Sequence, residues 1–168
     1  MRLAIAVLLL LVSVAPSAVH AAETEVPGSE HWKALEEAER IDADGLYRLR
    51  ERLGGRLILY DARSRRSYEE GHIEGARLPL TDRFYQEQEL FRLKVTQTPP
   101  DMDAALVSAV EGLDRTNPIV TYCDAECGAS KVLLAKLKNL GFTDVRALEG
   151  GYQSWAEKGY PVSGTSAR

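Results

Sequence analysis

Three short apolar runs, each followed by a stretch with helical spacing of apolar residues, constrain the fold most. They lie at residues 57–60, 118–122 and 145–148. The runs are continuous, which is typical of strands buried on both faces. Strands that alternate with helices predict an α/β fold, here a parallel sheet with helices on both faces. At 168 residues, the chain is expected to form a single domain.

Capping residues and apolar spacing predict the helices between these strands. Asp42 and Asp101 are candidate N-caps, and Gly54 and Gly141 are candidate stops. We expect a short strand at residues 77–80 and assign no element to residues 81–100. Helices are expected at residues 30–40, 43–53, 65–70, 102–113 and 129–140, and around Trp155.

The N-terminus is typical of a secretory signal peptide. Arg2 is followed by an apolar run and then by small residues that end at Ala21-Ala22. We predict a signal peptide at residues 1–21, a lead-in with a short helix at 22–40, and a folded domain at 41–164. The alternative is a membrane anchor, but the run is shorter than the ~20 residues that a spanning helix needs. The protein is therefore expected to be exported, periplasmic or secreted, with no membrane association after cleavage.

Charge and cysteine content narrow the classes of partner. The net charge is −4 and no basic block is present, so no nucleic-acid partner is expected. Cys123 and Cys127 are the two cysteines, which are too few and too close to form a disulfide framework or a structural zinc site. They are better interpreted as part of a functional site.

Cys123 follows the second strand, where ligands bind in open α/β sheets. The next residues are mostly small and lead into a helix. Such a loop can turn successive backbone N–H groups toward one point and stabilise an anion, and a thiolate there is a nucleophile. The alternative is a structural cysteine buried at a strand end.

Three motifs give this position a specific interpretation. Asp61-Ala62-Arg63 is followed by Gly71-His72-Ile73-Glu74-Gly75-Ala76, and Ile119 to Cys123 leads into the loop. Leu148-Glu149-Gly150-Gly151, Trp155 and Gly159-Tyr160-Pro161-Val162 close the pattern. In this order the chain resembles the rhodanese-like (sulfurtransferase) domain family over residues 41–162.

The resemblance implies a rhodanese-type domain that carries sulfane sulfur as a persulfide on the catalytic residue Cys123. A small sulfur donor would load it, and a thiol or protein acceptor would unload it, with no cofactor or metal. We expect the protein to be a monomer. Structural support is expected from Asp61, Arg63 and His72, with an ion pair at Arg63; a catalytic base is the alternative role of His72. Trp155 is expected in the core, and Gly75, Gly150 and Gly151 in turns. Backbone groups of the loop would bind substrate: Asp124, Ala125, Glu126, Cys127, Gly128, Ala129 and Ser130.

The loop departs from the family pattern in three ways. It is one residue longer than in common single-domain sulfurtransferases, and Ala129 stands where related phosphatases carry Arg, which argues against phosphatase activity. Asp124 and Glu126 add negative charges that would repel anionic donors, so efficient thiosulfate:cyanide activity is not expected. Cys127 is a candidate redox partner. The alternatives are a thiol–disulfide or peroxide-sensing protein that uses both cysteines, and a non-catalytic binding module.

Overall fold

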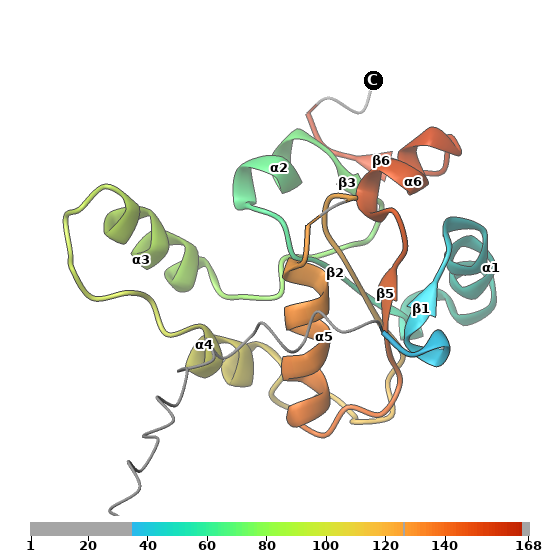
Figure 1. Cartoon of the computed structure of the whole chain (residues 1–168), viewed down its shortest axis with the longest axis horizontal. Coiled ribbons are helices and arrows are strands. Elements are labelled where there is room, and N and C mark those ends of the chain that lie inside the picture. Colours follow the sequence, from blue (N-terminus) through green and yellow to red (C-terminus); the bar gives the residue numbers. More distant parts are fainter. Residues whose placement is uncertain (1–34, 126, 166–168) are drawn as a thin grey trace, which may run out of the picture.

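The computed structural model describes residues 35–125 and 127–165 (Figure 1). The predicted signal peptide and most of the lead-in lie outside these residues. Among the described helices, none combines the length and apolar character needed to cross a bilayer. The strands are β1 (Arg40–Ile41), β2 (Ile58–Asp61), β3 (His72–Ile73), β4 (Ile119–Tyr122), β5 (Val145–Leu148) and β6 (Val162–Ser163). The helices are α1 (Ala43–Leu53), α2 (Arg65–Glu70), α3 (Asp82–Arg92), α4 (Met102–Ala109), α5 (Ala129–Asn139) and α6 (Gly151–Glu157).

The main sheet is parallel and has the order β1-β5-β4-β2. Strands β3 and β6 form a separate antiparallel pair. The three predicted apolar runs are the three longer strands of the main sheet, and all residues of β2 and β4 are buried. The predicted α/β fold with a parallel sheet is therefore confirmed.

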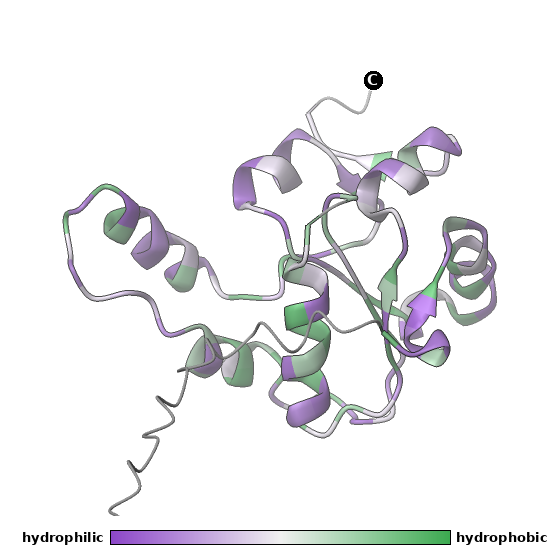
Figure 2. Cartoon of the chain, viewed as in Figure 1, coloured by the Kyte–Doolittle hydropathy of each residue, from purple (hydrophilic) through white to green (hydrophobic). Residues whose placement is uncertain are grey.

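Helices cover both faces of this sheet, as predicted. On one face, Leu106 at α4 and Leu137 of α5 pack with the strands in one hydrophobic cluster. On the other, Leu46 of α1 and Trp155 of α6 belong to a second cluster. In Figure 2 apolar residues recur on the strands and along α5, whereas α2 is mostly hydrophilic. Two cores thus hold β4 between them, and Trp155 is fully buried.

The predicted N-caps and most helix boundaries are confirmed, but the helix predicted at residues 102–113 ends at Ala109. The Asp42 carboxylate accepts the Gly45 N–H at 2.6 Å, and the Asp101 carboxylate accepts the Ala104 N–H at 3.0 Å. The helix predicted at residues 30–40 is wrong within its described part, where a 3₁₀ turn at Glu37–Glu39 leads into β1. Pairing of β1 with β5 overrides the local helical pattern there.

The strand predicted at residues 77–80 reduces to one bridge between Arg77 and Tyr60. Pro79 lacks an N–H group, so it cannot continue the ladder. Residues 81–100, to which the sequence assigns no element, contain α3, which is capped by Thr81. Figure 1 shows α3 standing away from the sheet. The helix has a weak sequence pattern because Phe84 is its only buried residue. The large hydrophobic side chains exposed among the described residues lie on α3, on α4 or between them: Leu90, Phe91, Leu93, Val95, Met102 and Val107.

Candidate functional site

Cys123 directly follows β4, which lies between β2 and β5 in the middle of the sheet. The residue is buried, with 1% of its surface exposed. Its carbonyl oxygen accepts the Tyr152 N–H of α6 at 2.8 Å. The hydroxyl of Thr121 in β4 donates to the Ser130 carbonyl at 2.9 Å, which ties the start of α5 to the same strand. The Cys123 backbone is thus held by α6, and the start of α5 is held against the strand that precedes the cysteine.

The approach of α6 to Cys123 depends on glycine. Gly151 has φ +58°, and a Cβ built on it would lie 2.1 Å from the Cys123 carbonyl oxygen. Gly150 also has positive φ, and its Cβ would meet Ser154 at 2.7 Å. The predicted turn role of these glycines is confirmed, and close packing against the cysteine adds a second reason for Gly151.

The Cys123 thiol donates to backbone carbonyl groups. Its Sγ lies 2.9 Å from the Cys127 carbonyl oxygen, 3.4 Å from that of Asp124 and 3.3 Å from the Ser130 hydroxyl. Burial raises the pKa of Cys123 to about 11; the neighbouring Cys127 thiol adds to this rise, while the Ser130 hydroxyl and amide oppose it. The thiol is therefore protonated at neutral pH in this arrangement.

Among the described residues of the loop, three amides are directed away from the Cys123 sulfur, contrary to expectation, and only the Ser130 amide acts on it. The Ala125 N–H donates to the Gln153 side chain at 3.0 Å, and the Cys127 N–H donates to the Asp124 carbonyl at 3.0 Å. The Ala129 N–H donates to the Cys127 sulfur at 3.3 Å. Gly128 precedes α5 at its N-cap position, and Glu126 lies outside the described residues. The carbonyl oxygens of Asp124 and Cys127 are directed at the Cys123 sulfur instead.

The charge of Asp124 is compensated by its neighbours. Its carboxylate accepts the Gln153 amide at 3.1 Å and lies 3.8 Å from the Arg63 guanidinium. The side chain is half exposed. The repulsion of anionic donors expected from this residue is therefore weaker than its charge alone suggests. The sequence does not indicate Gln153 as a site residue, because its contact with the loop depends on the docking of α6 beside it.

Asp61 and Arg63 form the predicted ion pair. The Arg63 Nη2 lies 2.7 Å from one Asp61 carboxylate oxygen, and Nε lies 3.0 Å from the other. The same Nη2 donates to the Gly71 carbonyl at 2.6 Å, and the guanidinium lies 4.2 Å from the centre of the Tyr152 ring. Both side chains of the pair are buried. The pair links the end of β2 to the β3 turn and, through Asp124, to the loop.

His72 makes scaffold contacts. Its Nδ1 lies 2.7 Å from the Tyr68 carbonyl oxygen, and its ring stacks on the Tyr68 ring with centroids 3.8 Å apart. These contacts orient the imidazole toward α2 and favour the supporting role over that of a base. Among residues 35–125 and 127–165, no three His, Cys, Asp or Glu side chains group as metal ligands.

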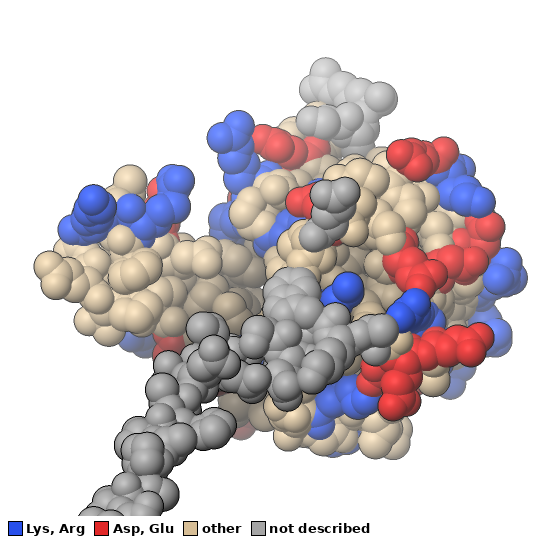
Figure 3. Space-filling view, in the orientation of Figure 1, with Lys and Arg blue, Asp and Glu red and all other residues tan. Residues whose placement is uncertain are grey.

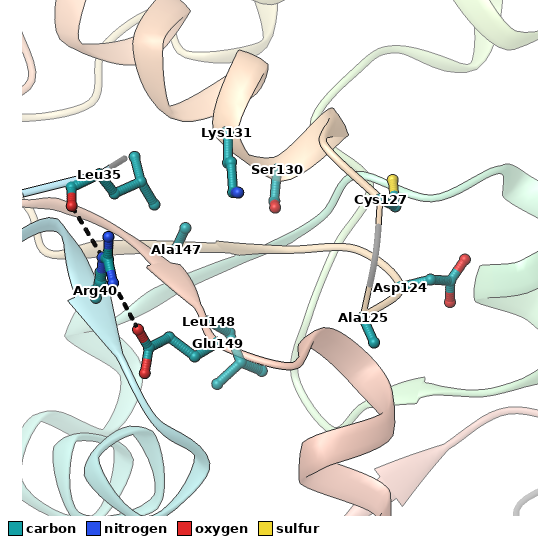
Figure 4. Close-up of a pocket in the computed structure, with 10 residues that line it drawn as sticks. All are labelled: Leu35, Arg40, Asp124, Ala125, Cys127, Ser130, Lys131, Ala147, Leu148 and Glu149. Carbon is teal, nitrogen blue, oxygen red and sulfur yellow. Dashed lines mark hydrogen bonds and ion pairs between the residues drawn. The ribbon is translucent and has the colours of Figure 1, made fainter. Parts of the chain in front are cut away.

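A cavity of about 180 Å³ opens beside the loop (Figure 4). Arg40 and Glu149 form an ion pair at 3.6 Å across one end, and Arg40 also donates to the Leu35 carbonyl. Sequence reasoning missed Arg40, because it was expected in a helix and not beside the site. Figure 3 shows acidic and basic side chains interleaved on this face of the molecule. The cavity is lined by Leu35, Arg40, Asp124, Ala125, Cys127, Ser130, Lys131, Ala147, Leu148 and Glu149.

Comparison with known proteins gives a consistent picture. A model of the rhodanese-like domain matches residues 42–158. The BH2092 protein from Bacillus halodurans is similar in structure, with a TM-score of 0.57 and 23% identity over 77% of this chain and 79% of that one. The rhodanese-like domain of the Alr3790 protein from Anabaena has a TM-score of 0.53 and 24% identity over 79% of this chain and 82% of that one. Likeness at these identities establishes the fold. No curated protein matches the chain.

Proposed function

The chain belongs to the rhodanese-like domain family, and from this premise we propose that it is a sulfurtransferase that carries sulfane sulfur as a persulfide on Cys123. The observation that supports this most is the position of that thiol. It ends the central strand, its carbonyl is held by α6, and the loop that follows opens α5. Ligand sites of open α/β sheets lie at such strand ends.

The proposed transfer has two half-reactions. The Cys123 thiolate attacks the outer sulfur of a donor, the bond between that sulfur and the rest of the donor breaks, and the remainder leaves with the electron pair. A thiolate acceptor then attacks the outer sulfur of the Cys123 persulfide, and the cysteine leaves as a thiolate. Sulfane sulfur moves without any external oxidant or reductant.

The protonated state of Cys123 sets a requirement for loading. A thiolate in this position would face the carbonyl oxygens of Cys127 and Asp124, which disfavour negative charge. We infer that these peptide groups turn away when sulfur is loaded. Ser130, whose hydroxyl and amide already act to lower the pKa of Cys123, is then the nearest group that can stabilise the charge.

A second candidate function has one observation in its favour. Cys123 and Cys127 are both free thiols, and the Cys123 sulfur lies 2.9 Å from the Cys127 carbonyl oxygen. A hydroperoxide could oxidise the pair to a disulfide, with release of an alcohol and water and reduction of the O–O bond. In that case the protein would act as a thiol-based peroxide sensor.

Mass spectrometry of the purified protein tests the proposed function. After incubation with thiosulfate or a small persulfide and removal of the donor, fragment spectra should locate one added sulfur on Cys123. A thiol acceptor should then remove it. Ser108→Cys supplies a control, because Ser108 is exposed on α4 and a thiol there should stay unloaded. Sulfur that is never found on Cys123 would overturn the proposal. Loss of two hydrogens after mild peroxide treatment, without sulfur loading, would favour the redox function.

We also propose that the protein is exported and acts as a monomer on a small sulfur donor and a thiol or protein acceptor. The basis for export is the N-terminal pattern at residues 1–21. N-terminal sequencing of protein recovered outside the cytoplasm should begin at Ala22 or Glu23. A chain that still begins at Met1 in the membrane fraction would contradict this proposal.

A further inference from the structure

The two cysteines of the loop differ sharply in access. Cys123 is 1% exposed, and its Sγ is enclosed by two carbonyl oxygens and the Ser130 hydroxyl. Cys127 is partly exposed and lines the cavity beside the loop, whereas Cys123 is not among the lining residues. A donor that enters the cavity therefore meets Cys127 first.

Cys127 also has the better environment for a nucleophilic sulfur. Its Sγ accepts the Ala129 N–H at 3.3 Å, at the first residue of the eleven-residue helix α5. Amide donors and the positive end of a helix favour negative charge. The amide at the first residue of α5 thus contacts the second cysteine and not the first.

The charges around the cavity suit an anionic donor. Of its two described acids, Glu149 is paired with Arg40, and Asp124 lies beside Arg63. Lys131 lines the cavity as well, and its side chain lies beside Ser130 in Figure 4. Thiosulfate and organic persulfides are both anions with a transferable outer sulfur, so they match this chemistry.

The two cysteines lie close together in the loop. The Cys127 carbonyl oxygen is 2.9 Å from the Cys123 Sγ. After burial, the neighbouring Cys127 is the largest cause of the raised pKa of Cys123. The backbone of Cys127 therefore contacts the Cys123 sulfur in the resting loop, and a short shift of this loop would bring the two sulfurs together.

We propose that Cys127 is a catalytic residue that takes sulfane sulfur from an anionic donor in the cavity and relays it to Cys123. The relay rests on the proposed function and adds an entry step. The Cys127 thiolate attacks the outer sulfur of thiosulfate, the S–S bond of the donor breaks, and sulfite leaves. The Cys123 sulfur then attacks the outer sulfur of the Cys127 persulfide. Cys127 leaves as a thiolate and takes the Cys123 proton, so atoms, charge and electrons balance.

Rapid-quench mass spectrometry on the full mature chain tests the relay with thiosulfate as the probe. In the wild type, the added sulfur should appear first on Cys127 and later on Cys123. Cys123→Ser should retain the sulfur on Cys127, because the second step has no nucleophile. Cys127→Ser should load Cys123 at least about tenfold more slowly, because the loop must open before the donor reaches a buried sulfur. Unchanged thermal unfolding would show that both variants are folded.

The outcomes separate the relay from the function on which it rests. If Cys127→Ser loads Cys123 at the wild-type rate, or Cys123→Ser takes up no sulfur, the relay is wrong and the proposed function stands. If wild-type sulfur stops at Cys127 and never reaches Cys123, the proposed function fails as well. Sulfur on Cys127 in the Cys123→Ser variant is the decisive positive result, since a purely structural Cys127 would not carry it.

Discussion

Replacing Gly151 with alanine tests the packing of α6 against the cysteine. Gly151→Ala places a Cβ 2.1 Å from the Cys123 carbonyl oxygen, a distance far shorter than Cβ contacts in folded proteins. The backbone must move, and the hydrogen bond from Tyr152 to that carbonyl is lost. Gly159→Ala is a matched control, because Gly159 also has positive φ (+69°) but no neighbouring atom within 4 Å of the added methyl group.

The difference between the two variants isolates the clash. Both incur the cost of a left-handed alanine, roughly 1–2 kcal/mol, and both gain from reduced freedom of the unfolded chain. Gly151→Ala additionally leaves a buried carbonyl without its partner, which costs about 1–3 kcal/mol, together with the strain of displacement. We expect its free energy of unfolding to fall by about 2–4 kcal/mol more than that of the control.

Urea unfolding followed by the fluorescence of the buried Trp155 measures this difference. The midpoint should shift while the slope with denaturant stays constant. The Cys123 thiol should also react faster with iodoacetamide in Gly151→Ala, because the contact that fixes its backbone is lost. Equal stability of Gly151→Ala and Gly159→Ala would refute the reasoning, since only the former contacts the cysteine.

Other contacts of the site and its surroundings can be tested separately. The rate of Cys123 alkylation should keep rising above pH 9 and level off near pH 11. The stability that the neutral thiol contributes is present below about pH 9 and should be lost as the pH rises toward 11. An alkylation rate that levels off near neutral pH would contradict the buried, protonated state. Asp61→Asn leaves the Arg63 charge buried without its partner and should lower the free energy of unfolding in urea by about 3–5 kcal/mol. Glu70→Gln, which breaks an exposed ion pair, should lower it by less than ~0.5 kcal/mol. Equal effects of the two substitutions would refute this prediction. Lys94→Gly should stabilise the fold by about 0.5–1 kcal/mol in thermal unfolding, because Lys94 has φ +60°; a loss of stability would show that its side chain matters more than its backbone.

The features that the sequence predicts correctly are those that depend on local interactions. The buried strands, the caps at Asp42 and Asp101 and the position of Cys123 at a strand end all depend on residues close together in the chain. The helix predicted up to residue 40 was wrong, because β1 forms only through pairing with β5, which lies over 100 residues away. Such pairing leaves no local signal.

The interior of the site was less predictable than its position. The loop was expected to aim its amides at Cys123, but it aims carbonyl oxygens there and gives an amide to Cys127. The peptide orientation depends on the anchoring of Ala125 by Gln153, a contact between distant segments. Residue types in a loop therefore indicate which groups are available and do not fix the direction in which each points.

The arm formed by α3 and the segment up to α4 has consequences for how the chain loses structure. Since Phe84 is the only buried residue of α3, the helix contributes little to either core. Elements with few buried contacts open at a small fraction of the global free energy. Amide hydrogens of α3 should therefore exchange with solvent long before those of β4, and a protease should cut this arm while the sheet remains intact. The arm and the sheet thus differ in local stability, and a probe at Trp155 reports only on the sheet and its cores.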